Sequence, residues 1–219
     1  MARSSTRRAQ PSSKTTQPRR PRKARRAPSS SADRLIDAAL GLLSEKAWQH
    51  VTLGEIAAVA GLTTTEAATT FPNKGAITAA FFCRIDKAVA SSGPAIEGSA
   101  RDRLFDVLMR RFDALAPHKS AVRAIANGMM TAPLFGLRAF PRYMASMARM
   151  LEVAEIDTAG PGGLLRVKGL ALVYVRTVSV WFTDDTPDLG QTMAALNKGL
   201  GWAERGAALC PFENWGARQ

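Results

Sequence analysis

The amino-acid sequence predicts an all-α protein, in which a small N-terminal helical domain precedes a larger C-terminal helical domain. Apolar residues recur at helical spacing from Ala32 onward. Gly and Pro interrupt this pattern at intervals that suit helices of ordinary length, and no segment alternates apolar and polar residues as a half-buried strand would. With 219 residues, of which 46% are hydrophobic and 22% charged, the chain is long enough to bury a core.

Residues 1–31 form a basic arm that differs from the rest of the chain. The arm contains ten Lys and Arg residues, no Asp or Glu, and no Leu, Ile, Val or Phe. Such a segment cannot bury enough surface to offset its ordering entropy, so we expect disorder. Because the chain as a whole carries 30 bases and 18 acids, almost all of its net charge of +12 lies in this arm.

Three interpretations of the arm remain open. It is a solvated tail without function, a mitochondrial transit peptide, or a segment that binds nucleic-acid phosphates. A transit peptide needs an amphipathic helix, for which the arm has no apolar face, and the lack of an apolar stretch excludes a secretory signal. Six bases are the candidate phosphate contacts: Arg19, Arg20, Arg22, Lys23, Arg25 and Arg26.

Residues 32–90 are expected to form a helix-turn-helix domain. The first helix runs from Ala32 to near Trp48. A second helix follows Thr52, which makes a capping box with Glu55, and stops at Gly61. A third helix starts almost at once. Two short helices joined by a tight Gly-containing turn are typical of this motif.

The third helix begins with a second capping box, Thr63 and Glu66, and ends at Phe71, before Pro72. A longer fourth helix continues through Ile85, and residues 91–99 are a linker. Residues 99–210 form the second domain. Its predicted helices span 101–115, 119–131, 134–156 with a kink at Pro141, 164–182, and 187–208 with Pro187 in the first turn.

Several classes of function are not expected. His50 and His118 are solitary and have no catalytic motif around them, so we predict no enzyme, no catalytic residues and no cofactor. Residues 160–163, GPGG, are a flexible turn, and Asp184 with its neighbour Asp185 is a solvated helix cap. The two cysteines lie far apart in sequence, so neither a disulfide framework nor a metal site is expected and a reducing compartment fits. The longest uncharged stretch, 124–137, has 14 residues and is too short to span a membrane.

The segment VTLGEIAAVAGLTTTEAATTFPNKGAITAAFF resembles the DNA-binding domain of the TetR family of transcriptional regulators, over roughly residues 33–85. The resemblance implies that the third helix enters the major groove and that Lys74 meets a phosphate. Groove-facing donors and acceptors are what a recognition helix needs. The candidate DNA-contacting residues of this domain are Thr52, Thr64, Thr65, Glu66, Thr69, Thr70 and Lys74.

This segment departs from the family pattern in its charge and its aromatic residues. Ala68 stands where the family usually has tyrosine, and Thr70 where it has histidine or tyrosine. The third helix has no Lys or Arg, and residues 33–84 contain four bases against five acids, which is unfavourable for a duplex binder. Glu66 could accept from a cytosine amino group, although its role in the capping box is the simpler explanation.

Methionine and aromatic residues of the second domain predict an adaptable apolar ligand cavity, although each of them alone is as well explained as core. The helix at 164–182 is apolar nearly all round and needs cover on several faces. The TetR resemblance implies a homodimer built on this helix and the last one. If these helices form the seam, we expect Val180 and Leu196 to lie in it. A monomer with the helix wholly interior is the alternative. The cavity candidates are Phe105, Met109, Phe112, Met129, Met130, Phe135, Phe140, Tyr143, Met147, Tyr174, Trp181 and Phe182.

Residues 166–200 also resemble the C-terminal segment of the mitochondrial accessory protein of ubiquinone biosynthesis. The likeness includes Tyr174, the Asp185-x-Pro187-Asp188 turn and Thr192. It implies an isoprenoid-lipid-binding protein of the same fold that does not regulate genes. Two hypotheses follow. The first is a ligand-responsive dimeric repressor that binds double-stranded DNA in a bacterial cytoplasm, and the second is a lipid-binding accessory protein whose first domain does not bind DNA.

Overall fold

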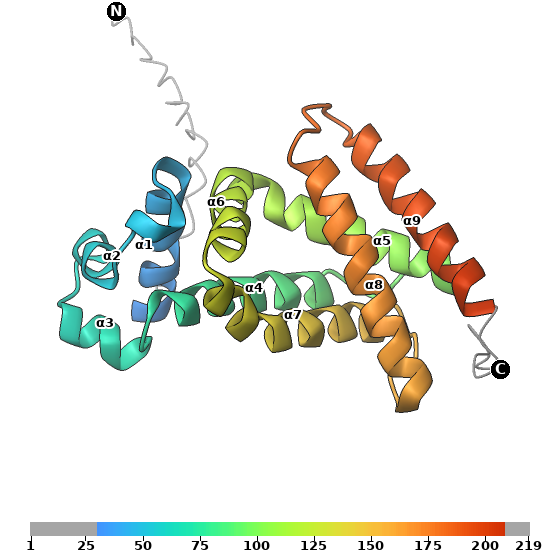
Figure 1. Ribbon diagram of the computed structural model, residues 1–219, viewed down its shortest axis with the longest axis horizontal. Coiled ribbons are helices and arrows are strands. Elements are labelled where there is room, and N and C mark those ends of the chain that lie inside the picture. Colours follow the sequence, from blue (N-terminus) through green and yellow to red (C-terminus); the bar gives the residue numbers. More distant parts are fainter. Residues whose placement is uncertain (1–29, 209–219) are drawn as a thin grey trace, which may run out of the picture.

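The computed structural model describes residues 30–208, and every regular element in this range is a helix, as predicted (Figure 1). No helix in this range is long and apolar enough to cross a membrane. The elements are α1 (Ser31–Glu45), the 3-10 helix η1 (Trp48–His50), α2 (Leu53–Ala60), α3 (Thr64–Thr70), α4 (Lys74–Ser91), α5 (Ala100–Leu115), the 3-10 helix η2 (Ala116–His118), α6 (Lys119–Thr131), α7 (Pro133–Val153), α8 (Gly160–Trp181) and α9 (Gly190–Ala208).

Both predicted capping boxes are present and fix the ends of the two short helices. The Thr52 hydroxyl accepts a hydrogen bond from the backbone N–H of Glu55, whose carboxylate accepts one from the backbone N–H of Thr52. Thr63 and Glu66 repeat the arrangement at the start of α3. Gly61, with φ of 66°, ends α2 in the left-handed conformation that glycine adopts without a steric penalty.

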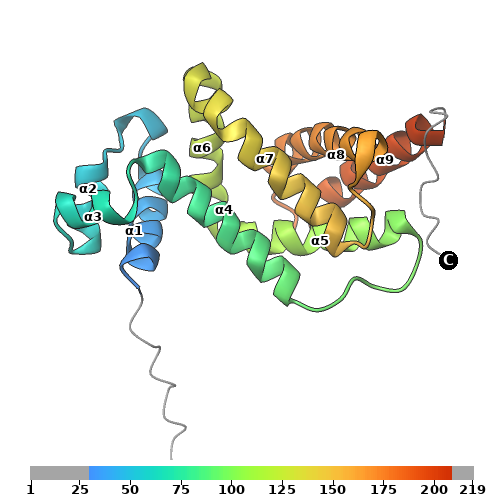
Figure 2. The ribbon, with the colours of Figure 1, turned by 90° about the horizontal axis from the view of Figure 1, so that it is seen from below.

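Helix α4 belongs to both halves of the molecule. It leaves the group α1–α3 and runs under α7 and beside α5 in the second group (Figure 2). The predicted domain boundary at residue 90 therefore falls at the end of a helix that both groups share. In the second group, α8 and α9 lie side by side (Figures 1 and 2). Their close approach depends on Gly199, where a Cβ would lie 2.7 Å from Val173 Cγ1.

Four predicted boundaries were wrong. Helix α1 ends at Glu45, before Trp48, which begins η1 instead. Helix α7 ends at Val153, because Glu155 adopts a φ of 56° and stops it. Residues 160–163 are the first turn of α8 and not a flexible turn. Helix α9 starts at Gly190, three residues after the predicted Pro187.

The late start of α9 is explained by Asp184, which was predicted as a solvated cap and is buried instead. Its carboxylate accepts hydrogen bonds from the backbone N–H and hydroxyl groups of both Thr186 and Thr192. These bonds favour the ionised form and hold the pKa of Asp184 well below its ordinary value. A turn organised by the carboxylate thus takes the place of the predicted helix start, while Asp185 stays exposed.

The two halves meet at Trp48. Its side chain lies against Gly128 of α6, where an added Cβ would come within 2.5 Å of Trp48 Cγ. Its ring stacks on that of Phe135 at the start of α7, with the ring centroids 4.3 Å apart. The indole of Trp48 is 5% exposed although it sits between two groups of helices. A residue of the N-terminal domain therefore packs against the last part of α6 and the start of α7.

The fit of Trp48 on Gly128 can be tested by adding one methyl group. We expect Gly128→Ala to lower the free energy of unfolding by about 1–3 kcal/mol, because the atoms it meets are at the base of a buried side chain and cannot swing away. Gly41→Ala in α1 is the control, since a Cβ there meets nothing within 4 Å, and it should stabilise slightly. Equal effects of the two substitutions in chemical denaturation would contradict this account of the joint.

Candidate nucleic-acid interface and ligand core

Helix α3 presents four exposed threonines, Thr64, Thr65, Thr69 and Thr70, and is fixed to the core by Ala67, which is fully buried. The hydroxyl groups of Thr69 and Thr70 donate to the carbonyl oxygens four residues earlier, at 2.9 and 3.0 Å. Their lone pairs and methyl groups therefore remain for an outside partner. This is a surface that can accept from base amino groups and contact thymine methyl groups.

The polar groups at the starts of α2 and α3 are used within the chain. The Glu66 carboxylate accepts from the backbone N–H of Thr63 at 2.7 Å and from its hydroxyl at 2.8 Å. These hydrogen bonds lower the pKa of Glu66. The Thr52 hydroxyl donates to Glu55 in the same way. The geometry thus gives Glu66 its capping role, which is the simpler of the two explanations.

Three of the four bases in residues 33–84 hold helices together. Arg34 donates to the carbonyl oxygens at the end of α2, including that of Gly61 at 3.0 Å. Lys46 pairs with Glu55 at 3.0 Å, which joins α1 to α2. Arg84 of α4 pairs with Asp37 of α1 at 2.8 Å. Residues 33–84 therefore offer fewer bases to DNA than the sequence count indicates, because these three cations already have partners within the chain.

The fourth base, Lys74, which the resemblance places against a phosphate, is half-buried. Its ammonium group donates to the carbonyl oxygens of Trp48 at 2.7 Å and Val51 at 2.8 Å, and lies 4.8 Å from the centroid of the Trp48 ring. Burial lowers the pKa of Lys74. An ammonium group has three donors, so one N–H remains for a phosphate. Lys74 is thus a structural residue of the joint whatever else it binds.

The six arm bases, Arg19, Arg20, Arg22, Lys23, Arg25 and Arg26, lie outside the described residues. The described chain begins at Ser30, the N-cap of α1, whose hydroxyl accepts from the backbone N–H of Asp33. The arm therefore enters the folded part directly at the first helix of the helix-turn-helix group.

Part of the predicted ligand cavity comes together as an aromatic cluster. Phe112 of α5 is fully buried, and its ring centroid lies 5.3 Å from that of Tyr174 and 5.6 Å from that of Trp181, both on α8. Tyr143 of α7 donates to the carbonyl oxygen of Ala171 at 2.6 Å. Met147 is fully buried as well. Four other candidates are half-buried against the hydrophobic core of the chain as a whole: Phe105, Met109, Met129 and Phe182.

Three other candidates are placed elsewhere. Met130 is 84% exposed and Phe140 is 55% exposed, so neither lines an enclosed cavity in this structure. Phe135 stacks on Trp48 at the joint between the two halves. Helical spacing could not distinguish these positions from the core, because α6 and α7 are covered on only part of their circumference. The sequence pattern predicted a larger apolar set than the structure assembles.

Sequence reasoning missed a charged group inside this core. Asp86 of α4 and Arg111 of α5 have side chains that are each 3% exposed, with Asp86 Oδ1 and Arg111 Nη2 3.2 Å apart. Arg149 of α7 approaches the other carboxylate oxygen at 3.4 Å. Arg111 also donates to Ser146 at 3.0 Å and lies over the Tyr174 ring. The burial of its charges is what distinguishes this group, and a sequence does not show burial.

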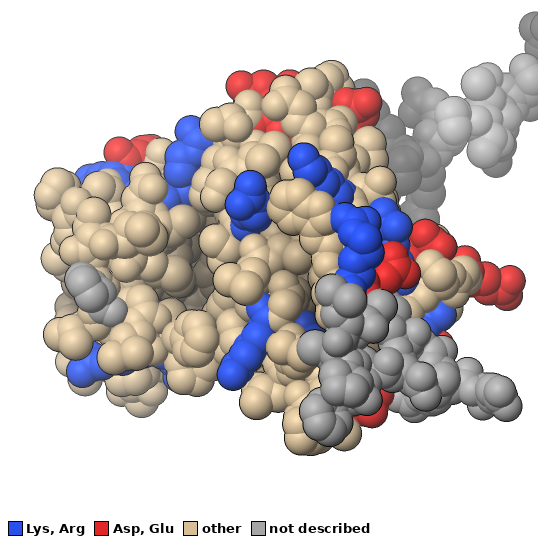
Figure 3. Space-filling view, turned by 45° about the vertical axis from the view of Figure 1, so that its right-hand side comes forward, with Lys and Arg blue, Asp and Glu red and all other residues tan. Residues whose placement is uncertain are grey.

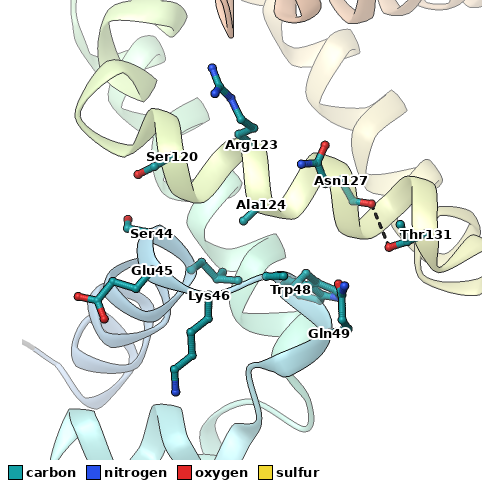
Figure 4. Close-up of a pocket in the computed structure, with 12 residues that line it drawn as sticks. Ser44, Glu45, Lys46, Trp48, Gln49, Ser120, Arg123, Ala124, Asn127 and Thr131 are labelled. Carbon is teal, nitrogen blue, oxygen red and sulfur yellow. Dashed lines mark hydrogen bonds between the residues drawn. The ribbon is translucent and has the colours of Figure 1, made fainter.

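A hollow of about 430 Å³ lies between the end of α1 with η1 and one face of α6 (Figure 4). The charged heads of Lys46 and Arg123 point away from each other, and each has a partner: Glu55 for Lys46 and the carbonyl oxygen of Phe182 for Arg123. No polar groups converge on one point, and none of the predicted cavity residues lines it. The hollow separates the two halves beside the Trp48 joint.

Neither a family model nor a curated protein matches the sequence. Solved structures do match. A TetR transcriptional regulator from Nitrosomonas europaea has a TM-score of 0.64 and 23% identity, over 80% of this chain and 98% of that one. One from Rhodococcus sp. RHA1 has a TM-score of 0.62 and 19% identity, over 84% and 97%. One from Streptomyces coelicolor has a TM-score of 0.54 and 20% identity, over 82% and 85%.

These three structures are regulators of one kind, whereas the likeness of residues 166–200 to the ubiquinone-biosynthesis accessory protein stays a prediction. At this level of identity the comparisons concern architecture alone. The chain has the fold of the TetR-family transcriptional regulators, with a helix-turn-helix group at its N-terminal end and a helical group after it.

Proposed function

We propose that this protein is a ligand-responsive transcriptional regulator, acting as a repressor in a bacterial cytoplasm, that binds operator DNA as a homodimer. The observation that carries the proposal is the exposed threonine face of α3, held in a defined orientation by the capping box at its start and by the buried Ala67. A helix of this kind with a free polar face is what direct readout in the major groove requires. The fold supports the same conclusion.

In this proposal the arm supplies most of the phosphate contacts. The bases at the start of the folded domain are engaged with Gly61, Glu55 and Asp37, so they cannot serve DNA without giving up those partners. Ten bases lie in residues 1–31, directly before α1. Cationic segments of this type bind duplex DNA by releasing counterions, independently of base sequence. The arm then provides affinity, and α3 provides sequence preference.

The proposed dimer uses α8 and α9. Helix α8 leaves Leu165, Leu172 and Val175 exposed, Leu172 by 74%, and α9 exposes Trp202 by 48%. Figure 3 brings forward the right-hand side of Figure 1, where α8 and α9 lie. This face has broad areas without charged side chains, and Lys and Arg side chains lie between these areas. Leu196, expected in the seam, is fully buried within one chain instead. An apolar face of two neighbouring helices fits a two-fold four-helix contact.

A second candidate function is supported by one observation. The third helix has no base, and the helix-turn-helix bases serve the fold, which is also what a domain that no longer binds DNA would show. The protein would then hold an isoprenoid or quinone lipid among Phe112, Tyr174 and the residues around them. Stoichiometric co-purified isoprenoid, together with no sequence-dependent DNA binding in any ligand state, would favour this candidate.

The role of the arm is tested by removing residues 2–28, which keeps the Ser30 cap of α1 intact. Affinity for the gene's own upstream DNA should fall sharply, and its salt dependence should flatten by roughly 0.9 in log K against log salt for each phosphate that the arm no longer neutralises. Replacing the five arginines among the six arm candidates by lysine should leave both quantities unchanged. Full affinity and an unchanged slope in the truncated protein would rule out this role.

The recognition helix is tested with Thr65→Ala and Thr69→Ala. Both side chains are exposed, so melting behaviour should stay unchanged while preference at particular base pairs changes by about 1–3 kcal/mol. Lys74→Ala should instead weaken binding to all sequences and also lower stability by about 1–3 kcal/mol, because two buried carbonyl oxygens lose their donor. Threonine variants that bind every sequence as the wild type does would count against readout by α3.

The dimer is tested with Leu172→Arg. A charge in the centre of an apolar contact costs several kcal/mol, so this variant should sediment as a folded monomer. Ile96→Arg, at another exposed apolar position in the segment between α4 and α5, should stay dimeric. A wild-type protein that is monomeric at micromolar concentration would refute the proposed assembly.

A further inference from the structure

The charged group in the C-terminal core has more positive than negative charge. It consists of one carboxylate, that of Asp86, and two guanidinium groups, those of Arg111 and Arg149. Arg111 is almost wholly buried, whereas the Arg149 side chain is 43% exposed at the rim of the group. A buried guanidinium needs an anionic partner, and Arg111 shares the carboxylate of Asp86 with the partly solvated Arg149. The composition of the group therefore fits a second carboxylate.

The hydrogen bonding of the pair is also incomplete. Asp86 Oδ1 and Arg111 Nε are buried and have no hydrogen-bond partner among the described residues, although Oδ1 lies 3.2 Å from Arg111 Nη2. The indole Nε1 of the buried Trp181 has none either. Buried donors and acceptors in folded proteins are nearly always paired. The Nε–H of Arg111, whose guanidinium lies over the Tyr174 ring, is thus a buried donor to which an acceptor could bind.

We infer that the C-terminal core binds an apolar ligand carrying a carboxylate, and that Arg111 exchanges Asp86 for the carboxylate of this ligand. Arg111 suits this role because a guanidinium can bind a carboxylate with two parallel hydrogen bonds, and its Nε–H is free to make one of them. The rings of Phe112, Tyr174 and Trp181 pack on one another in this structure, and the apolar body of the ligand would enter between them.

After the exchange, both Asp86 and Arg111 still have a partner of opposite charge. Asp86 keeps its contact with Arg149, whose exposed side chain can follow the carboxylate toward the surface. The ligand charge in turn neutralises Arg111 in the interior. A direct replacement of one carboxylate by another thus avoids the large cost of an unpaired buried ion.

This inference rests on the proposed function for its regulatory meaning. Asp86 lies on α4, which begins at Lys74 and so reaches the Trp48 joint and the helix-turn-helix group. Breaking the contact between Asp86 and Arg111 removes an ion pair that joins α4 to α5. A ligand that makes this exchange would therefore bind α4 states unequally, which is the requirement for coupling to DNA.

Calorimetric titration of the full chain with two matched probe pairs tests the inference. Naphthoate is compared with naphthamide, and dodecanoate with dodecanamide, so that within each pair the charge differs while shape and apolar area are nearly equal. At least one carboxylate should bind, and more tightly than its amide. Arg111→Gln should weaken carboxylate binding by about tenfold or more, and Asp86→Asn should strengthen it several-fold because the internal competitor is gone. Arg110→Gln is the control: it removes the Arg110–Asp106 pair and hydrogen bonds to Gly93 and Pro94, all outside the group, and should leave the affinity for both members of each probe pair unchanged.

Asp86→Asn should strengthen the binding of carboxylates and not of amides, whereas a loosened fold would bind both more tightly. This comparison keeps the inference testable even if the arginine variant unfolds. The inference would be overturned by equal binding of carboxylates and amides or by weaker carboxylate binding in Asp86→Asn than in the wild type. It would also be overturned if neither the wild type nor Asp86→Asn bound a carboxylate. Titration with the gene's upstream DNA is a separate measurement. Carboxylate binding without DNA binding would remove the proposed regulator and leave this ligand site standing.

Discussion

The arrangement of the whole molecule depends on the contact of Trp48 with Gly128. A tryptophan that follows the first helix inserts against the backbone of α6, stacks on Phe135 and offers its own carbonyl oxygen to Lys74. Because the fit leaves no room for a Cβ at residue 128, a side chain there would force Trp48, and with it the helix-turn-helix group, away from α6. Any ligand-driven change that moves α6 or the start of α7 must pass through the same contact.

The bases of the N-terminal domain are also engaged in contacts within the fold. Three of them, Arg34, Lys46 and Arg84, connect helices, and Lys74 donates to backbone carbonyl oxygens at the Trp48 joint. The fold therefore already uses the bases that a DNA-binding surface would need to expose. The proposed regulator resolves this conflict by separating the tasks. Base edges meet the hydroxyl and methyl groups of α3, and phosphates meet the arm. Binding by such a protein would be unusually sensitive to salt, because its affinity comes from an extended cationic segment.

Local features of the fold could be predicted from the sequence, and long-range features could not. The capping boxes at Thr52 and Thr63 and the stop at Gly61 involve neighbours within a few residues, so their spacing is visible in the chain. The burial of Asp184 depends on Thr192 in the next helix, and the group around Asp86 depends on three helices. Met130 and Phe140 have the spacing of core residues, but their exposure is decided by which neighbours cover α6 and α7.

The central claim is that this chain recognises a DNA sequence through α3 while its arm holds the backbone. Selection of duplexes bound by the full-length protein from a random pool, at fixed salt, tests this most directly. The account predicts enrichment of an inverted repeat whose half-sites lie about one helical turn apart, as two α3 helices of a dimer require. Retention of DNA without any common sequence, or no retention at all, would contradict it.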